Sequence, residues 1–323
     1  MALRKMENEQ RENAVRSACA QLRDNAVQEL QLSYKGLREE ELRKVILALK
    51  ENSSLTILNL SGSSISECGA REVALALKEN NSLTSLDLAR NRFGEGGARE
   101  LASALKENSS LTSLRLWATD LGEAGVRVVA MVLKDSSLTT LHLGHNFFGD
   151  NGVIHVALAL KENSRLTSLN IAYSVISESG ARELALALKE NSSLTFLNLE
   201  GNHFGEGGAR EVAMALKENS SLTSLRMGNT AIGNGGAKQL AMALLENCCL
   251  RTLGLNACRI RECGAREMAV MLLQNNTLTS LSLAENDFGK GGAPELLAAL
   301  EQNSSLVFLN LTGNHIGQVT VRH

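Results

Sequence analysis

The chain has 323 residues, 44% of them hydrophobic but only 3% aromatic, and a formal net charge of -2. This charge gives no general attraction for polyanions, so neither nucleic acid nor an anionic membrane is an expected partner. The sequence has no signal-peptide pattern, no apolar run of about 18 residues and only six cysteines, none in a CxxC pair, so a cytoplasmic, reduced protein is expected.

The N-terminal segment, residues 1–26, is charged and helix-like, and it lies outside the repeat that fills the rest of the chain. It is predicted to be a helical cap that shields the leucines of the first repeat from water. Residues 27–323 are predicted to form one repeat domain whose last repeat is incomplete. The strand pattern after Leu306 continues to Asn314 and Gly317, and beyond it we expect frayed ends and a natural chain that is truncated or continues.

The repeat emerges when the sequence is aligned with itself, which gives a strong match at a shift of 28 residues. Its clearest copy is residues 83–110, LTSLDLARNRFGEGGARELASALKENSS. Eleven copies begin at Val27, Leu55, Leu83, Leu111, Leu138, Leu166, Leu194, Leu222, Leu250, Leu278 and Leu306. The fourth copy is one residue short because KDSS replaces KENSS in a predicted surface turn, where a deletion is easily absorbed.

Each copy changes its hydrophobic period halfway. Leu86 and Leu88 alternate with polar residues, which is typical of a strand with one buried face. A spacing of i, i+3, i+4 and i+7, the pattern of an amphipathic helix, follows at Ala98, Leu101, Ala102 and Leu105. The glycines of residues 94–97 separate the two elements, and Asn108 with its serines ends the helix. Each copy is therefore strand, bend, helix and return.

One such unit cannot fold alone. Burying five or six Leu-like side chains stabilises it by roughly 10–15 kcal/mol, while ordering its backbone costs at least as much, at about 1–2 kcal/mol per residue. Neighbouring units must supply the difference. The predicted fold class is an α/β solenoid of about eleven repeats, a horseshoe with parallel strands on the concave face and helices on the convex face.

A fixed polar position follows the strand leucines. Down the chain it reads Ser63, Asn91, Thr119, Asn146, Ser174, Asn202, Thr230, Cys258, Asn286 and Asn314. An Asn at this position is predicted to bond the turn backbone on either side and to form a ladder. The N-x-S/T sequons at Asn52, Asn108, Asn191, Asn219 and Asn303 belong to the repeated return turn, so we interpret them as turn chemistry and not as glycosylation sites.

The frame L-x-x-L-x-L-x-x-N, the helix G-A-x-x-L-A-x-A-L and the Asn that alternates with Ser or Thr resemble the ribonuclease-inhibitor type of leucine-rich repeat. That subfamily includes ribonuclease inhibitor, the innate immune sensor regions of nucleotide-binding leucine-rich-repeat receptors, and Ran GTPase-activating protein. The resemblance covers residues 27–323. This chain lacks the cysteine richness of ribonuclease inhibitor and any P-loop, so only a sensor region of such a receptor is implied.

Seven side chains stand out at positions predicted to face the concave side or its rim. They are Arg90, Arg115, Trp117, His142, His145, Tyr173 and Arg226. Neighbouring strands lie about 4.8 Å apart, so the first six are predicted to form one patch. Its composition is typical of a protein-binding hot spot, although Trp117 packed over its own turn is the alternative. Phe196 and Phe308 would extend an apolar surface.

Other motifs have structural interpretations. His142 and His145 form H-x-x-H, but two extended residues without a third ligand do not make a zinc site. The G-E-G-G-A sequence recurs in several repeats, which indicates a bend and helix entry instead of a nucleotide site. Cys68 and Cys263 are interpreted as small packing residues, and Cys248 and Cys249 as the most exposed thiols. No cofactor, metal or small-molecule substrate is expected.

Three functional classes follow. The first is a non-enzymatic scaffold or sensor that binds a partner protein on the concave face, since no acid–base pair, activated nucleophile or metal site is recognisable. The second, implied by the resemblance alone, is a GTPase-activating protein of the Ran type. The third is a ribonuclease inhibitor. An inhibitor of basic ribonucleases should be acidic inside, whereas Arg and Asp or Glu mix at the exposed strand and rim positions here.

Overall fold

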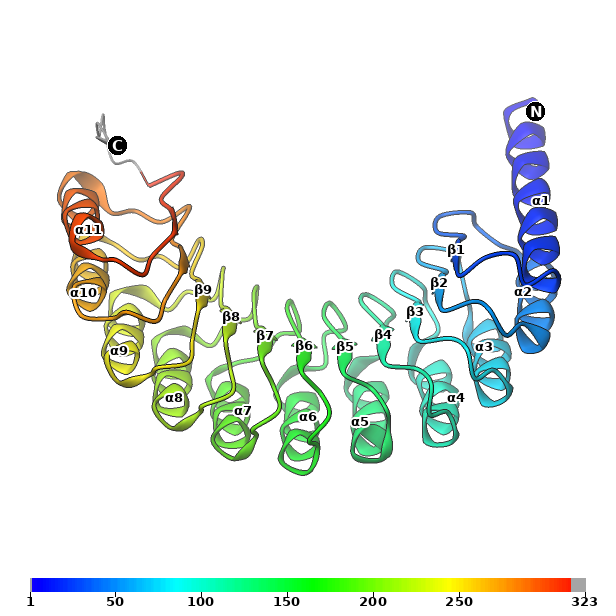
Figure 1. Cartoon of the computed structure of the whole chain (residues 1–323), viewed down its shortest axis with the longest axis horizontal. Helices are drawn as coiled ribbons and strands as arrows, with labels where there is room; N and C mark the ends of the chain where they lie inside the picture. Colours follow the sequence, from blue (N-terminus) through cyan, green and yellow to red (C-terminus); the bar gives the residue numbers. More distant parts are fainter. Residues whose placement is uncertain (1, 315–323) are drawn as a thin grey trace. The chain divides into compact units, whose positions relative to one another are not determined.

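The computed structural model describes residues 2–314, including the side chains of residue 6 and of residues 8–314. It divides into two compact units, the N-terminal half (residues 1–147) and the C-terminal half (residues 148–323). Each half is built from the same repeat of a three-residue strand, a bend, a helix and a return turn (Figure 1).

The N-terminal half begins with the long helix α1 (Ala2–Arg23). Its strands are β1 (Glu29–Gln31), β2 (Ile57–Asn59), β3 (Ser85–Asp87), β4 (Ser113–Arg115) and β5 (Thr140–His142). Its other helices are α2 (Glu39–Glu51), α3 (Glu67–Glu79), α4 (Gly94–Glu107) and α5 (Gly122–Val132), followed by the short helix η1 (Leu133–Asp135). The strands pair in parallel with their neighbours, and the helices lie together on one side of the sheet (Figure 1).

The C-terminal half repeats the arrangement. Its helices are α6 (Gly149–Glu162), α7 (Glu178–Glu190), α8 (Gly205–Glu218), α9 (Gly233–Glu246), α10 (Glu262–Leu272) and α11 (Gly289–Gln302). Its strands are β6 (Ser168–Asn170), β7 (Phe196–Asn198), β8 (Ser224–Arg226), β9 (Thr252–Gly254), β10 (Ser280–Ser282) and β11 (Phe308–Asn310). These strands are also parallel and paired in order. The predicted solenoid of parallel strands backed by helices is confirmed in each half.

The hydrophobic core of each half lies between its strand layer and its helix layer. In the third repeat, Leu83, Leu86 and Leu88 are fully buried from the strand side, and Leu101 and Leu105 are buried from the helix. The middle leucine of each strand pairs with the middle leucine of the next, so one register runs through each sheet. These are the positions that the two sequence periods predict, and each buried leucine contributes about 1.5–3 kcal/mol.

A hydrogen-bond ladder runs along the strand ends, as predicted. The Oδ1 atom of Asn91 accepts hydrogen bonds from the backbone N–H groups of Ser63 (3.0 Å) and Ile65 (2.9 Å). Its Nδ2 donates to the carbonyl oxygens of Leu60 (3.0 Å) and Leu88 (2.8 Å). The same pattern recurs at Asn146, Asn202 and Asn286. In all four cases the preceding repeat carries Ser, Thr or Cys at this position.

The alternation breaks twice in the C-terminal half. Thr230 is followed by Cys258 instead of an Asn, and the Cys258 thiol donates to the carbonyl oxygen of Met227 at 3.1 Å. Asn286 is followed by a second asparagine, Asn314, whose buried Oδ1 has no hydrogen-bond partner among the described residues. Among the described residues, the four asparagines that complete all four bonds each follow a repeat with Ser, Thr or Cys at this position.

A second asparagine ladder fixes the return turns and explains the sequons. The Oδ1 atom of Asn108 accepts from the N–H groups of Ser110 (3.1 Å) and Leu111 (2.8 Å). Its Nδ2 donates to the carbonyl oxygens of Leu77 (2.7 Å) and Asn80 (3.0 Å). The sequon asparagines Asn52, Asn108, Asn191 and Asn219 are all at most 5% exposed. Because the side chain of each also accepts hydrogen bonds from the backbone of its own turn, the turn interpretation is confirmed for these four residues.

The one-residue deletion in the fourth repeat is absorbed locally. Ser136 takes the place of the turn asparagine, and its hydroxyl donates to the carbonyl oxygen of Leu133 at 3.0 Å. The chain reaches the next strand through η1 instead of a full helical turn. The strand register between β4 and β5 is unchanged.

The N-terminal segment is helical, as expected. Val15, Ala18 and Leu22 of α1 are buried, and α1 packs against α2. The domain boundary at residue 26 and the capping role stay predictions. The expectations for the C-terminus beyond Asn314, including Gly317, lie outside the described residues.

Candidate functional site

A residue in the left-handed backbone conformation follows the strand in each repeat and directs the side chains that come after the sheet. Its φ lies between 53° and 76° at Tyr34, Gly62, Arg90, Ala118, His145, Tyr173, Gly201, Asn229, Ala257, Glu285 and Gly313. A residue other than Gly costs roughly 1–2 kcal/mol there. Three of the predicted site residues, Arg90, His145 and Tyr173, occupy this position, which is a regular feature of the repeat because most repeats hold a residue other than Gly there.

A row of charged and polar side chains crosses β3, β4 and β5 in the N-terminal half. Asp87 is in register with Arg115, and Arg115 is in register with His142. The Arg115 Nη1 and Asp87 Oδ2 atoms lie 3.8 Å apart, with 53% of the Arg115 side chain exposed. The guanidinium is thus positioned by a loose ion pair and keeps much of its surface accessible.

His142 is half-buried. Burial lowers its pKa from 6.5, the positive charge of Arg115 lowers it further, and Asp87 acts in the opposite direction. The imidazole is therefore neutral at pH 7, where it can both donate and accept a hydrogen bond. A neutral His beside a cationic Arg offers a partner a polar contact without a second positive charge.

Next to this row lies an aromatic cluster. The ring centroids of Trp117 and His145 are 5.9 Å apart, and those of His145 and Phe147 are 4.7 Å apart in an edge-on arrangement. Phe147 is 58% exposed, whereas Trp117 is half-buried. Both distances fall within the 4.5–7 Å range of favourable aromatic pairs. Trp117 thus packs on its neighbour while keeping part of its surface open, which combines the two alternatives considered for it.

The N-terminal half brings five of the seven predicted residues onto one side of three consecutive repeats. The backbone N–H of Arg90 donates to the carbonyl oxygen of Trp117 at 2.7 Å, so Arg90 lies beside the aromatic cluster. We call the set Arg90, Arg115, Trp117, His142, His145 and Phe147 the strand-side patch. Phe147 was missed from the sequence, although an apolar residue where other repeats have Arg92, His203 or Asp287 was a usable signal.

The other two predicted residues lie in the C-terminal half and make local contacts there. The Tyr173 ring covers Gly201 so closely that a Cβ added to Gly201 would lie 2.2 Å from Tyr173 Cδ1. The Arg226 guanidinium lies 5.7 Å from the centroid of the Phe196 ring, within cation–π range. Phe308, on β11, is 54% exposed. Tyr173 therefore combines a packing role with a 42% exposed surface.

The cysteines differ in part from expectation. Cys68 and Cys263 were expected to be packing residues, but both are exposed, because they lie on the solvent side of the first helical turn, and the buried side is taken by Gly69 and Gly264. Cys248 is exposed and Cys249 is half-buried, so these two are not the most exposed thiols as a pair.

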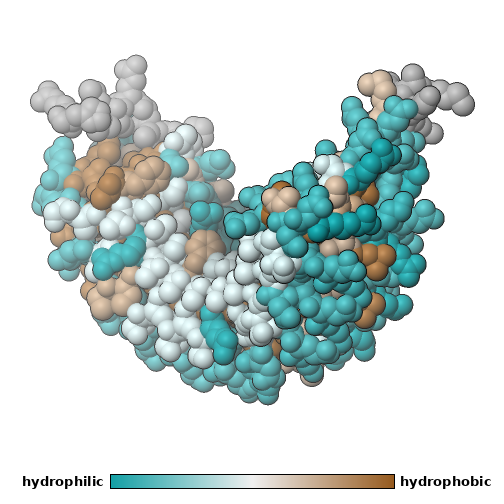
Figure 2. Space-filling view, turned by 45° about the vertical axis from the view of Figure 1, so that its right-hand side comes forward, coloured by the Kyte–Doolittle hydropathy of each residue, from teal (hydrophilic) through white to brown (hydrophobic). Residues whose placement is uncertain are grey.

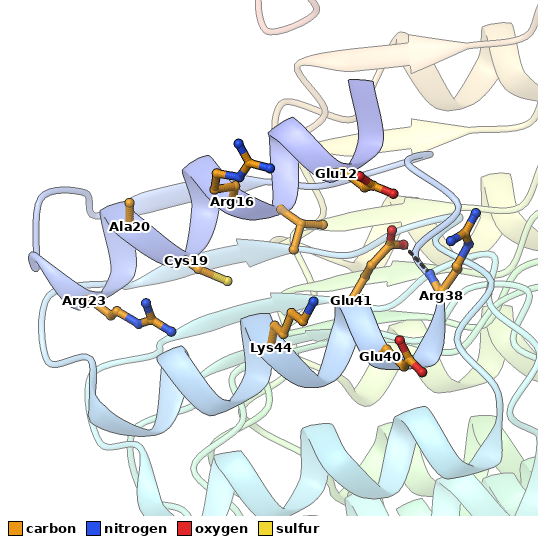
Figure 3. Close-up of a pocket in the computed structure, with 10 residues that line it drawn as sticks. Glu12, Arg16, Cys19, Ala20, Arg23, Arg38, Glu40, Glu41 and Lys44 are labelled. Atoms are coloured by element: carbon orange, nitrogen blue, oxygen red, sulfur yellow. Dashed lines mark hydrogen bonds between the residues drawn. The ribbon is translucent and has the colours of Figure 1, made fainter. Parts of the chain in front are cut away.

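A groove of about 430 Å³ lies between α1 and α2 (Figure 3). Cys19 and Arg23 project into it from α1, and Glu41 and Lys44 from α2. Burial raises the pKa of the Cys19 thiol, so it is not an activated nucleophile. Burial acts to raise the pKa of Glu41 too, but the backbone N–H of Arg38 and an ion pair at 2.9 Å with Arg11 lower it overall. The carboxylate is thus held charged as a structural ion pair.

Neither a metal centre nor a membrane-spanning helix is found in the described part of the chain. Among the described side chains, no three His, Cys, Asp or Glu residues gather closely enough to hold a metal ion. None of the helices between residues 2 and 314 combines the length and apolar character that a membrane crossing needs. In Figure 2 the visible surface is mostly hydrophilic or intermediate, with hydrophobic areas that are separate from one another.

The comparison with protein families identifies the repeat. Six segments match the family described as "Leucine Rich repeat", at residues 79–102, 134–157, 190–213, 218–241, 274–296 and 302–319. These six segments are thus similar to leucine-rich repeats. The leucine spacing, the asparagine ladders and the parallel strands seen in each half agree with this similarity. No curated protein sequence gives a significant match to the chain.

Solved structures are similar to this chain at low sequence identity, and one of them shares its fold over nearly the whole chain. The yeast structure described as "Crystal structure of Rad7 and Elc1 complex in yeast" is 15% identical, with a TM-score of 0.56 over 99% of this chain and 93% of that chain. Leiomodin-1 Actin-Binding Site 2 is 20% identical, with a TM-score of 0.38 over 54% of this chain and 87% of that one. The tropomodulin C-terminal domain of Caenorhabditis elegans is 17% identical, with a TM-score of 0.36 over 55% and 92%.

Proposed function

We propose that this leucine-rich-repeat chain is a non-enzymatic, cytoplasmic scaffold or sensor module that binds a partner protein through the strand-side patch. The observation that carries the proposal is the aromatic cluster of Trp117, His145 and Phe147 beside the exposed guanidinium of Arg115. Trp, Tyr and Arg are the residues that most often dominate binding energy in interfaces. A partly exposed aromatic group costs little conformational entropy when a partner covers it.

The backbone beneath the patch is held rigid. Asn91 and Asn146 tie the turns of neighbouring repeats together through buried hydrogen bonds. A partner therefore meets side chains on a fixed frame and does not need to order a loop, which lowers the cost of binding. The charged row adds selectivity, because Arg115 and Asp87 favour a partner with the complementary pattern.

The finer family assignment is also a proposal. The Asn that alternates with Ser or Thr supports a repeat of the ribonuclease-inhibitor type, since Asn91, Asn146 and Asn202 each bond a Ser or Thr repeat before them. The sensor regions of nucleotide-binding leucine-rich-repeat receptors belong to that type. The yeast structure holds Rad7 in a complex with Elc1, which agrees with a protein-binding use of this fold.

The test is affinity capture from cytosol with the unchanged chain and with a Trp117→Ala plus Arg115→Glu variant as baits. We expect partners retained by the unchanged chain to be lost from this variant. The matched control is Met131→Ala plus Arg127→Glu, which alters the same repeat on helix α5, where Met131 is 68% exposed. If every captured protein survives the first variant, or if both variants lose the same proteins, the strand-side patch is not the binding surface.

A further inference from the structure

Two adjacent thiols lie on one return turn of the C-terminal half. Cys248 and Cys249 follow α9 and precede β9, and their Sγ atoms are 3.8 Å apart. Cys248 is exposed and Cys249 is half-buried. The equivalent turn of the preceding repeat carries Ser220 and Ser221. No other repeat of this chain places two sulfur atoms side by side in its sequence.

The backbone that carries the two thiols is fixed by the turn asparagine. The Oδ1 atom of Asn247 accepts from the N–H groups of Cys249 (3.0 Å) and Leu250 (2.8 Å), and its Nδ2 donates to the carbonyl oxygen of Leu216 at 2.6 Å. Asn247 is only 6% exposed. The sulfur atoms can approach each other by side-chain rotation alone, while the turn itself stays in place.

In the preceding turn the serine makes different contacts. The Ser221 hydroxyl donates to the carbonyl oxygen of Leu194 at 3.0 Å and lies 3.4 Å from that of Asn191. The Cys249 thiol instead faces Cys248. Burial, followed by the contact with Cys248, raises the pKa of Cys249, so the Cys249 thiol is held neutral at pH 7. This replaces a structural hydrogen bond with a pair of soft, accessible donor atoms.

The donor set defines what can bind. Soft sulfur ligands select soft metals and metalloids, but a structural zinc site needs four ligands and a catalytic one three. Among the described residues no group of three or more His, Cys, Asp or Glu side chains is suited to a metal ion. Two sulfurs alone suit an element that brings its own third substituent.

We propose that Cys248 and Cys249 form a chelating site for monosubstituted trivalent arsenicals. An organic arsenoxide, R–As=O, reacts with the two thiols to give R–As(S)₂ bound to the protein and one molecule of water. Two As–S bonds replace the As=O bond, and both thiol protons leave in the water. Arsenic stays trivalent and sulfur is not oxidised, so the step needs no oxidant or reductant.

Chelation should make this pair bind the arsenical more tightly than the single exposed thiols do. Once one sulfur is bound, the second reacts within the same turn at an effective concentration in the millimolar range or above. We therefore expect the pair to bind at least about 100-fold more tightly than a single thiol. Cys68 and Cys263 are exposed but have no cysteine beside them in the sequence, so they serve as internal controls.

The test uses phenylarsine oxide with the fully reduced whole chain, and the bound product is counted by intact mass after challenge with excess 2-mercaptoethanol. We expect one phenylarsenic adduct per chain, released by dithiothreitol. Cys248→Ser and Cys249→Ser should each reduce its retention at least about 100-fold. The Cys68→Ser plus Cys263→Ser variant should retain it.

The Ser variants are expected to fold normally, because Ser is the residue found at these two positions in the preceding repeat. A gain-of-function variant completes the design: Ser220→Cys plus Ser221→Cys, in a chain whose Cys248 and Cys249 are both replaced by Ser, should bind one adduct again. The proposal is overturned if the unchanged chain retains no adduct after the monothiol challenge, or if either single Ser variant retains it undiminished.

Discussion

Replacing Asn91 with Ala tests whether the strand-end ladder holds neighbouring repeats together. The substitution leaves the buried N–H groups of Ser63 and Ile65 without their acceptor and removes the donor to Leu60 and Leu88. Each orphaned buried group costs about 1–3 kcal/mol. Because the carbonyl oxygens have a second lone pair and lose less, we expect Asn91→Ala to lower the free energy of unfolding by about 3–5 kcal/mol.

Thr119→Ala is the matched control, since Thr119 is buried at the same position of the next repeat. Its hydroxyl donates to the carbonyl oxygen of Leu116 at 2.8 Å and lies 3.3 Å from the Oδ1 atom of Asn146, and no backbone N–H group loses its acceptor when it is removed, so its loss should cost about 1 kcal/mol. Urea unfolding gives both values, and hydrogen exchange at Ser63 and Ile65 reports the local effect. If the two variants differ by less than about 1 kcal/mol, or if exchange at these amides is unchanged in Asn91→Ala, the ladder does not stabilise the fold as argued.

Two further predictions concern backbone strain and pH. Gly201→Ala should destabilise the chain by about 2–3 kcal/mol, because the φ of Gly201 is +68° and an added Cβ would meet the Tyr173 ring. Adding Tyr173→Ala should recover part of this loss. Equal free energies of unfolding for the single and double variants would rule out the clash. Burial, then Arg115, lowers the pKa of His142 below its unfolded value of 6.5, so the folded state binds fewer protons than the unfolded state. The contribution of the neutral His142 to stability is therefore complete above pH 6.5 and is lost as the pH falls through the folded pKa. His142→Gln should therefore lose less stability than the unchanged chain between pH 7 and pH 5, and equal losses in urea unfolding would contradict this sign.

The fold was predictable because its determinants are local and repeated. Leu86 and Leu88 mark the strand, and Leu101 and Leu105 mark the helix, through a change of period that recurs in each copy. Even the asparagine ladder followed from chemistry, since a buried turn backbone needs partners that neither sheet nor helix supplies. The two breaks in this ladder, at Cys258 and Asn314, occur where Asn and a Ser or Thr residue do not alternate between neighbouring repeats. That alternation matters because of the hydrogen bonds that Asn91 and its equivalents make to the repeat before them, and these are visible only in the structure.

The sequence was enough to predict where the candidate site lies, but not which of its side chains contact one another. Alternation along β4 placed Arg115 and Trp117 on one side, and the structure adds that Trp117 pairs with His145 and that Phe147 completes the cluster. Such contacts depend on the left-handed backbone conformation that follows each strand, and the spacing of hydrophobic residues in the sequence does not predict this conformation. The exposure of Cys68 was also misjudged, because the first helical turn of a repeat has one side that faces the core and one that faces solvent, and Cys68 lies on the solvent side.

The most direct measurement of the central claim is a hydrogen–deuterium exchange footprint of the chain with a partner recovered by the unchanged bait. Protein binding at the strand-side patch predicts added protection in the segments 85–92, 113–120 and 140–147, which hold the patch, with helices α3, α4 and α5 unaffected. Protection confined to those helices, with the three strand segments exchanging as in the free chain, would contradict it.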